Sequence, residues 1–301
     1  MRVGVIGTGN MGENHVKTYL SMKEYCEFIG IYDNDEEKGR SIAEKYKVKQ
    51  FQSLKRLLES VDAVSIAVPT EFHYDIGLLC TEHKVHMLME KPITDTGEKA
   101  EDLIQKASQA GVKLQVGHIE LFNPLINMLS KELENEKIIG FDFHRMNPYD
   151  NKMKNIDVVE DLMIHDLYIL RKLLKDNVTD FYTLGTIIEN TPKHATVIAK
   201  SSKGVISQFT ASFKSKRKIR TIKVLTEGAL VEADILAGRM KVSSDTNTKT
   251  ITVDNDIQPL QLQLIDFIDC IESQRTPSVS GDDGINALQM SKEISNAIYH
   301  H

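Results

Sequence analysis

A glycine-rich turn near the start of the chain is the feature that most constrains its fold. The apolar run Val3–Ile6 leads into Gly7, Gly9 and Gly12, which have the spacing G-x-G-x-x-G, and a helical pattern follows. In such a strand–turn–helix the first glycine permits the tight turn, the second lets the backbone approach a pyrophosphate, and the third lets the helix pack closely on the strand. The motif therefore predicts a dinucleotide-binding unit with its phosphate site at the positive end of the helix dipole.

An acidic residue follows at about the distance, roughly 20 residues, that this motif requires. Asp33 directly follows the next apolar run, Phe28–Tyr32. A carboxylate there accepts hydrogen bonds from the ribose hydroxyls of NAD and repels the 2′-phosphate of NADP. Asn34 and Asp35 come next rather than an arginine, so NAD is the expected cofactor and NADP the less favoured one. An alternative is that Asp33 caps the helix predicted to begin near Glu36.

The first part of the chain has the pattern of a doubly wound sheet. Short apolar runs without alternation, typical of parallel strands buried on both faces, alternate there with helical patterns. The strands are expected at residues 2–6, 27–32, 63–68, 86–89 and 113–116. This series predicts an α/β fold, a doubly wound parallel (Rossmann) sheet, in a dinucleotide-binding domain over residues 1–118.

After Gly117 the pattern changes. Helices are expected at residues 124–133, 161–174, 259–272 and 284–299, and strands at 138–146, 180–189, 195–201, 204–213, 219–226, 229–234 and 250–253. Apolar and polar residues alternate in Ile206–Ala211, which is typical of an antiparallel sheet with one face in water. We therefore expect an α+β domain over residues 119–301, built on an open, mainly antiparallel sheet, for substrate binding and oligomerisation.

Composition and spacing exclude several classes of protein. The net charge of −6 argues against a general nucleic-acid binder. No run approaches the roughly 20 apolar residues of a membrane span, and the first apolar run is too short for a signal peptide. Cys26, Cys80 and Cys270 lie far apart and suit neither a disulfide framework nor a zinc site, and no H-E-x-x-H motif occurs. We expect a cytoplasmic protein that binds no metal, nucleic acid or membrane.

Three further segments resemble those of one family. Val68–His73 and Glu90–Pro92 lie at the ends of two successive predicted strands, and Asp161 and His165 lie on a predicted helix of the second domain. In this order and on these elements they resemble the glucose–fructose oxidoreductase and inositol dehydrogenase (Gfo/Idh/MocA) family, over nearly the whole chain. With the glycine motif, the resemblance implies cofactor contacts from four strand ends. They are Gly7, Thr8, Gly9, Asn10, Met11, Gly12, Asp33, Asn34, Val68, Pro69, Thr70, His73, Glu90 and Lys91.

The resemblance also implies that Lys91, Asp161 and His165 are catalytic in the oxidation of a secondary alcohol. Lys91 would hydrogen-bond the reacting oxygen, and His165, with a usual pKa of about 6.5, would take the hydroxyl proton or pass it to Lys91. Residues four apart share one face of a helix, so Asp161 can orient His165, with Asp166 as the alternative carboxylate. The residues alone leave other interpretations open: a solvated Lys91, Asp161 as a helix N-cap and His165 as a packing residue.

The sequence says less about the substrate. Gly117–Pro124 is similar to a segment of nucleotide-sugar members of the family, notably UDP-N-acetylglucosamine 3-dehydrogenases, although Leu121 replaces their usual arginine. The glycine pair usual before the catalytic helix is also missing. The basic stretch Lys214–Arg220 either neutralises a substrate diphosphate or faces water. The expected substrate contacts are His118, Glu120, Asn123, Arg145 and His165.

The expected function is therefore transfer of a hydride between NAD and a secondary alcohol of a sugar, nucleotide sugar or polyol, with C3 of a UDP-N-acetyl sugar as one position. A non-catalytic NAD-binding sensor on the same fold is the alternative from a different class, and a family reductase of an imine or tetrapyrrole is another. The open sheet needs its second face covered, and the resemblance implies a homodimer or homotetramer.

Overall fold

The computed structural model describes residues 1–150, 153–253 and 258–300, and the chain folds into two compact units. The first unit consists of Met1–Ile119 and Gln258–Asn286, and the second of Glu120–Ile257 and Ala287–His301. The first segment ends next to the predicted boundary at residue 118. The return of residues 258–286 to the first unit was not expected, because their local pattern says only that they are helical. Among the described residues, no helix combines the length and the apolar character needed to cross a membrane.

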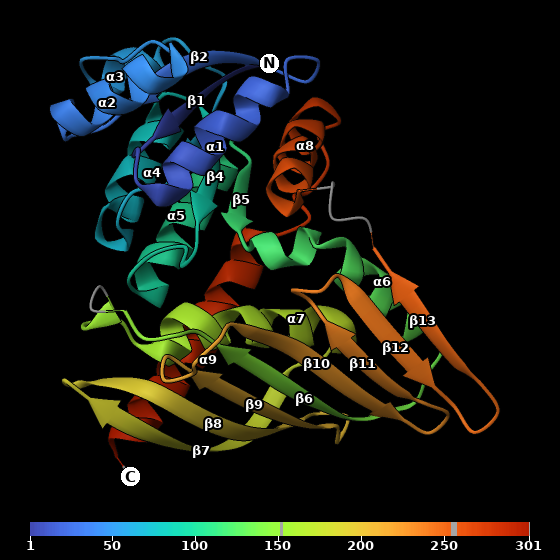
Figure 1. Ribbon diagram of the computed structural model, residues 1–301. Coiled ribbons are helices and arrows are strands. Elements are labelled where there is room, and N and C mark those ends of the chain that lie inside the picture. The colour runs from blue at the N-terminus through green and yellow to red at the C-terminus, as the bar shows by residue number, and fades with distance from the viewer. Residues whose placement is uncertain (151–152, 254–257, 301) are drawn as a thin grey trace. The chain divides into compact units, whose positions relative to one another are not determined.

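The first unit contains a five-stranded parallel sheet in the order β2-β1-β3-β4-β5, which confirms the predicted doubly wound fold (Figure 1). Its strands are β1 (Arg2–Ile6), β2 (Glu27–Tyr32), β3 (Ala63–Ile66), β4 (His86–Glu90) and β5 (Leu114–Gly117). Its helices are α1 (Asn10–Ser21), α2 (Glu36–Tyr46), α3 (Leu54–Leu58), α4 (His73–Glu82), α5 (Gly97–Gln109) and α8 (Pro259–Glu272). Sheets of this order bind ligands beyond the carboxyl ends of β1 and β3, where the winding direction changes.

Helix α8 belongs to the first unit because its apolar face completes the core there. Leu264 and Phe267 of α8 lie in one hydrophobic cluster with Val16 and Tyr19 of α1 and Val3 of β1, and each of the five side chains is at most 1% exposed. Burying a side chain of this size contributes about 1.5–3 kcal/mol. This contact packs α8 against α1, the helix that follows the glycine turn.

The second unit contains an eight-stranded sheet in the order β13-β12-β11-β10-β6-β9-β8-β7, with β6 and β9 parallel and the other pairs antiparallel. The strands are β6 (Ile138–Met146), β7 (Val178–Ile188), β8 (Thr191–Ser201), β9 (Ile206–Ser212), β10 (Ile219–Thr226), β11 (Leu230–Asp234), β12 (Arg239–Ser243) and β13 (Thr248–Thr252). The expected mainly antiparallel sheet is confirmed. Strand β12 was not predicted, because its short run of polar and apolar residues gives no distinct strand signal.

The two faces of this sheet differ. On one face Phe143 stacks between Phe141 and Phe209, with ring centroids 5.6 and 4.9 Å apart. Helices α6 (Pro124–Glu132) and α7 (Ile164–Leu174) cover this face (Figure 1). The opposite face carries exposed apolar side chains, which are Tyr182, Leu184, Ile198, Ile206, Leu225 and Leu230. The last helix, α9 (Gly281–Tyr299), begins in the first unit and ends in the second.

Candidate active site

The three glycines of the motif have different structural roles. Gly7 has a φ of +86°, which suits glycine, and a Cβ on Gly12 would lie 1.9 Å from the Gly7 carbonyl oxygen. A Cβ on Gly9 would instead meet one neighbouring atom within 4 Å, the Lys38 Nζ at 3.9 Å. Packing therefore requires Gly7 and Gly12, whereas Gly9 leaves open space at the N-terminus of α1. Backbone N–H groups and a lysine ammonium around such a space fit the pyrophosphate of a dinucleotide.

A pocket of about 180 Å³ lies beyond the carboxyl ends of β1 and β2. Its walls are mainly apolar, and one carboxylate group of α4 and another at the end of β2 border it. The lining residues are Ile6, Gly7, Tyr32, Asp33, Asn34, Leu54, Val68, Pro69, Phe72, Asp75 and Ile76. Apolar walls with a few placed polar groups are typical of a small-molecule site, and here they fit an adenine ring and its ribose. The predicted residues Gly7, Asp33, Asn34, Val68 and Pro69 meet in this pocket.

Asp33 organises the turn between the two strands. Its Oδ2 accepts hydrogen bonds of 2.6 Å from both the backbone N and the Oγ1 of Thr8, and its Oδ1 accepts one of 2.9 Å from the backbone N of Asp35. An ionised carboxylate has about four acceptor positions, so it can also accept from a ribose hydroxyl. The N-cap of α2 is Asp35, which accepts from the backbone N of Lys38 at 3.1 Å, and not Asp33.

His73 joins the ends of two neighbouring strands. Its Nδ1 lies 2.9 Å from the carbonyl oxygen of Pro92 and its Nε2 lies 3.0 Å from that of Val68. The side chain is 1% exposed, and burial lowers the pKa of His73 despite these two contacts. His73 therefore holds the loops that carry Val68 and Lys91, while Thr70 begins the 3₁₀ turn η1 (Thr70–Phe72) at the pocket edge.

Glu90 is the last residue of β4 and Lys91 follows it, and the buried His118 directly follows the next strand, β5. A Cβ on Gly117 would lie 2.9 Å from the carboxylate carbon of Glu90, so β5 packs directly on that side chain. His118 is 1% exposed, and burial, together with the positive charge of Lys91, lowers its pKa to about 3. His118 is therefore neutral at physiological pH.

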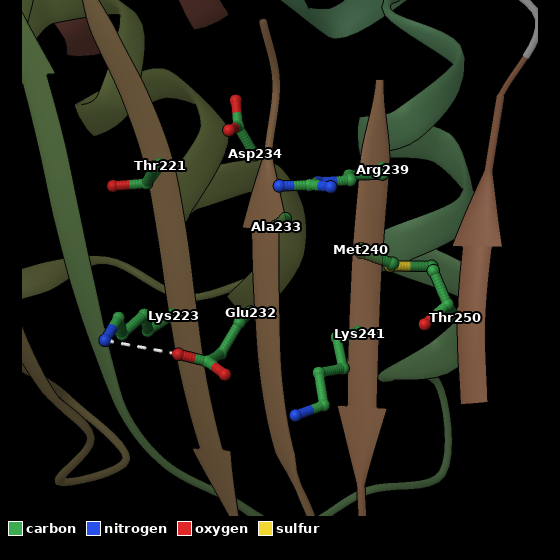
Figure 2. Close-up of a pocket in the computed structure, with 9 residues that line it drawn as sticks. All are labelled: Thr221, Lys223, Glu232, Ala233, Asp234, Arg239, Met240, Lys241 and Thr250. Carbon is green, nitrogen blue, oxygen red and sulfur yellow. Dashed lines mark ion pairs between the residues drawn. The ribbon is translucent and has the colours of Figure 1, made fainter. Parts of the chain in front are cut away.

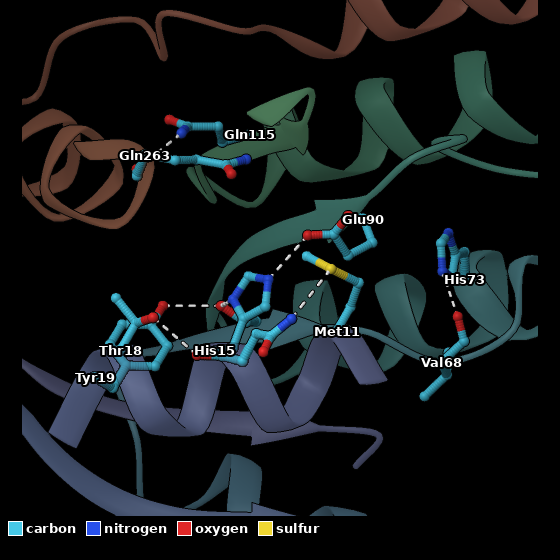
Figure 3. A network of polar contacts seen from close by, with 11 residues as sticks. Met11, His15, Thr18, Tyr19, Val68, His73, Glu90, Gln115 and Gln263 are labelled. Atoms are coloured by element: carbon cyan, nitrogen blue, oxygen red, sulfur yellow. Dashed lines mark hydrogen bonds and ion pairs between the residues drawn. The ribbon is translucent and has the colours of Figure 1, made fainter. Parts of the chain in front are cut away.

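A polar network in the first unit was not expected from the sequence (Figure 3). His15 of α1 contacts Glu90 at 2.9 Å and Ser65 at 3.0 Å, and Tyr19 contacts Ser65 at 2.9 Å. A histidine, His15, on the apolar face of α1 was the one local signal, but the sequence could not say which residue it meets.

In the second unit, Arg145 lies at the centre of a buried cluster of charges. The side chain is 1% exposed, its Nε donates to Asp166 Oδ1 at 2.9 Å, and its Nη1 donates to Glu120 Oε1 at 2.9 Å. Burial opposes its charge, but the two carboxylates raise the pKa of Arg145 above its usual value. Burial raises the pKa of Asp166, although Arg145 opposes the rise. The buried guanidinium is connected to the protein surface through Glu120, whose side chain is 21% exposed.

The predicted helix with Asp161 and His165 starts with a π-helical turn. This turn spans Val159–Met163 and contains Asp161, and α7 follows with His165 in its first turn. Both side chains are half-buried. Asp157 makes the capping contact, accepting from the backbone N of Val159 at 2.7 Å, so Asp161 is not needed as a cap. π-turns often occur at functional sites.

Lys193 is a residue whose role the sequence did not reveal. Its side chain is buried, and its Nζ donates to the carbonyl oxygens of Met153, Lys154 and Ile156 at 2.8, 2.9 and 2.7 Å, as well as contacting Thr191 Oγ1. Burial lowers the pKa of Lys193. The ammonium therefore fixes the turn that leads into the π-helical segment.

The segment 120–125 serves the fold as well as the expected site. Asn123 caps α6, because its Oδ1 accepts from the backbone N of Leu125 at 2.9 Å. Leu121 is 5% exposed, and its carbonyl oxygen accepts from Lys172 Nζ at 3.1 Å. A buried leucine thus stands where the resemblance leads one to expect an arginine.

The basic stretch divides into exposed and half-buried parts. Lys214, Lys216, Arg217 and Lys218 are exposed. Arg220 is half-buried and donates to the carbonyl oxygen of Met146 at 2.9 Å, and burial with nearby Arg145 lowers its pKa to about 10.

A larger pocket, of about 440 Å³, lies on the second sheet over β10, β11, β12 and β13 (Figure 2). Charges of both signs line it, and Lys223 pairs there with Glu232 at 3.2 Å. None of the predicted site residues lines this pocket. Among the residues that the structure describes, no group of three or more histidine, cysteine, aspartate or glutamate side chains is placed to hold a metal ion.

A protein-family model matches the first part of the chain, and curated proteins match nearly the whole of it. Residues 1–118 match an oxidoreductase family described as having an NAD-binding Rossmann fold. UDP-N-acetylglucosamine 3-dehydrogenase of Acidithiobacillus ferrooxidans is 27% identical over 99% of this chain and 97% of that protein. Myo-inositol 2-dehydrogenase of Thermotoga maritima is 24% identical over 96% of this chain and 93% of its own length.

Solved structures agree with these matches. The structure of the A. ferrooxidans UDP-N-acetylglucosamine 3-dehydrogenase has a TM-score of 0.95 and 26% identity, over 100% of this chain and 98% of that one. Levoglucosan dehydrogenase, solved with NADH and levoglucosan, has a TM-score of 0.89 over 100% and 97% of the two chains, but at 14% identity this likeness shows the fold alone.

Proposed function

This chain belongs, through residues 1–118, to the Gfo/Idh/MocA family of oxidoreductases with an NAD-binding Rossmann fold, and from that premise we propose that it oxidises C3 of a UDP-N-acetyl sugar. One observation carries the choice of substrate. The similarity to UDP-N-acetylglucosamine 3-dehydrogenase extends through the second unit, where four of the five expected substrate residues lie, and covers 99% of this chain. A sugar or polyol with a free secondary alcohol is the broader class to which this substrate belongs.

The first unit would hold NAD along the carboxyl ends of its strands. Gly9 and the N–H groups of α1 would bind the pyrophosphate, Asp33 the adenosine ribose, and Glu90 the nicotinamide end. When bound, NAD would supply the hydride acceptor for the substrate carbon. The backbone and side chains around these three residues would orient it and exclude water. Val68 and Pro69 line the pocket, and Thr8 holds Asp33.

Lys91 and His165 would carry the proton chemistry. The alcohol loses a hydride from carbon with its electron pair and a proton from oxygen, and a ketone forms. Lys91 would donate a hydrogen bond to the reacting oxygen, and His165 would take the proton. Asp161, in the π-helical turn just before His165, would orient that imidazole.

The other expected substrate residues act in two ways in this proposal. His118 and Glu120 would contact the sugar, and Arg145 would act through Glu120, because its guanidinium is buried against that carboxylate. Asn123 would donate a hydrogen bond to the substrate from its amide nitrogen, since its Oδ1 already accepts from the backbone N of Leu125 at the start of α6.

The test is a substrate panel with NAD, read as absorbance of the reduced cofactor. We expect turnover of UDP-N-acetylglucosamine well above that of myo-inositol and free hexoses. Lys91→Ala and His165→Ala should each lower kcat by roughly 100-fold or more, the range for losing a positioned acid or base. NAD binding without turnover of any member of the panel would instead favour a non-catalytic sensor.

Full turnover by both variants would show that the catalytic assignment is wrong, whatever the substrate. Preferred turnover of myo-inositol would keep the enzyme class and overturn the nucleotide-sugar assignment.

We also propose a homodimer or homotetramer held together by the uncovered face of the second sheet. Cross-strand register puts Tyr182 opposite Ile198 and Leu225 opposite Leu230 on that face, and all four are 38% exposed or more. Exposed apolar side chains that gather on one face of a sheet favour an interface. Light scattering after size exclusion should give a multiple of the 34.0 kDa chain mass, and Ile198→Glu should shift it to the monomer. A monomeric unsubstituted protein would refute this.

We place the enzyme in the cytoplasm because all three cysteines are free and buried, as is usual in a reducing compartment.

A further inference from the structure

The network that begins at His15 joins the glycine-turn helix to the end of β4 (Figure 3). His15 lies one turn after the glycines and is fully buried. Its Nε2 lies 2.9 Å from Glu90 Oε1, and its Nδ1 lies 3.0 Å from Ser65 Oγ. Tyr19 Oη lies 2.9 Å from the same Ser65 hydroxyl. Four side chains from α1, β3 and β4 therefore form one continuous chain of polar contacts.

The chemistry of the four groups gives this chain one direction. Burial raises the pKa of Tyr19 well above its usual value, so its hydroxyl keeps its proton. An ionised Glu90 can only accept hydrogen bonds, so the His15 proton that is donated to it must be on Nε2. With this tautomer Nδ1 can accept from the Ser65 hydroxyl, and the Ser65 oxygen can accept in turn from Tyr19. Every donor in this series of four side chains then has an acceptor, and His15 Nε2 donates to the Glu90 carboxylate.

The Glu90 side chain is held from two sides. His15 contacts its carboxylate on one side, and the backbone of Gly117 on β5 leaves no space for even a Cβ on the other. Glu90 also precedes Lys91 directly, so whatever holds Glu90 holds the start of the loop with Lys91. His15 connects this end of the site to α1, the helix that would bind the pyrophosphate.

We propose that His15 is a positioning residue. It sets Glu90 and the nicotinamide end of the cofactor site relative to the phosphate cradle, by which we mean the glycine turn Gly7–Gly12 at the N-terminus of α1. The proposal rests on the proposed placement of Glu90 beside the nicotinamide. Because the side chain of His15 contacts Glu90 and Ser65, its loss should affect the nicotinamide half of NAD and spare the adenosine diphosphate half.

Two probes separate these halves. NAD spans both ends of the site, whereas ADP-ribose lacks the nicotinamide ring. In His15→Asn the shorter amide can still meet Ser65 but not Glu90, and we expect the Kd of NAD to rise roughly 10- to 100-fold, the range for a lost hydrogen bond to a charged group. The Kd of ADP-ribose, measured by the same calorimetry, should change less than about threefold, within the error of a neutral change.

A conservative variant and a matched control complete the test. In His15→Gln the amide nitrogen takes the place of Nε2, so NAD affinity should recover to within a few-fold of the original. His86 begins the same strand β4 and accepts from the backbone N of Lys113 at 2.9 Å, at the end away from Glu90. His86→Asn should leave both Kd values unchanged.

The outcomes distinguish the inference from its premise. Equal loss of NAD and ADP-ribose affinity in His15→Asn, or no loss of either, overturns the positioning role. Glu90→Gln tests the premise: if it does not weaken NAD selectively, Glu90 is not at the nicotinamide end and the inference fails with it. A selective effect of Glu90→Gln without one of His15→Asn refutes the role of His15 and keeps the proposed site.

Discussion

Replacing Arg145 with methionine tests what holds the proposed substrate side of the second unit. The Arg145 side chain is 1% exposed and Asp166 is 4% exposed, and Nε lies 2.9 Å from Asp166 Oδ1. Methionine has a similar length and no charge, so Asp166 would stay in the interior without its partner. Removing one member of a buried ion pair costs about 3–5 kcal/mol. We expect that loss in the free energy of unfolding for Arg145→Met, and a comparable one for Asp166→Leu.

The double variant provides the decisive comparison. Apolar residues of similar volume often replace a buried ion pair with little loss. Glu120, the other partner of Arg145, is 21% exposed in its side chain and can turn toward water. The variant with both Arg145→Met and Asp166→Leu should therefore be more stable than either single variant.

Arg2 and Asp62 offer a matched surface control. Their ion pair has a distance of 2.7 Å, but the side chains are 49% and 43% exposed, so water and salt weaken it. Urea unfolding followed by circular dichroism would measure all variants, and Arg2→Met should leave the midpoint almost unchanged. If Arg145→Met costs no more than Arg2→Met, or if the double variant loses the sum of the two single losses, the burial argument is refuted. Arg145→Met should also weaken substrate binding more than NAD binding, through Glu120.

Three shorter predictions concern the first unit. Gly12→Ala should abolish measurable NAD binding in a calorimetric titration, because its Cβ would lie 1.9 Å from the Gly7 carbonyl oxygen; retained affinity would contradict the packing role. Lys38→Ala should weaken NAD binding roughly threefold in dilute buffer and not in about 1 M salt, where charges are screened over ~3 Å; a salt-independent loss would exclude a phosphate contact. His118 has a folded-state pKa of about 3, so its stabilisation is complete above the unfolded pKa of about 6.5 and is lost as the pH falls from there toward 3. Urea unfolding at pH 7 and pH 5 should therefore show a smaller loss for His118→Gln than for the original protein, and an equal loss would argue against a buried neutral imidazole.

The sheet of the first unit was predictable because its signals are local. Glycines at the turn and unbroken apolar runs such as Val3–Ile6 need no knowledge of distant residues. Five parallel strands were expected and five are present. The return of α8 to this unit was not predictable, since the apolar stripe of Leu264 and Phe267 shows that the helix is buried but not against what.

Two carboxylates show the same limit within the site. The sequence left open whether Asp33 and Asp161 are helix caps, because an aspartate before a helical pattern suits both roles. In the structure Asp35 and Asp157 make the capping contacts. Which aspartate caps a helix depends on the direction of its side chain. That direction changes when the helix begins a few residues earlier or later.

By itself, the sequence determined the glycine turn at Gly7–Gly12, the position of Asp33 at the end of its strand, and the strand ends that carry Glu90 and Lys91. These follow from turn chemistry and apolar periodicity within short segments. Only the tertiary structure decided that His15 reaches Glu90, 75 residues along the chain. It likewise decided that the Arg145 guanidinium turns inward to Asp166 and Glu120. A buried polar group must find its partner wherever the fold brings one, and local sequence does not name that partner.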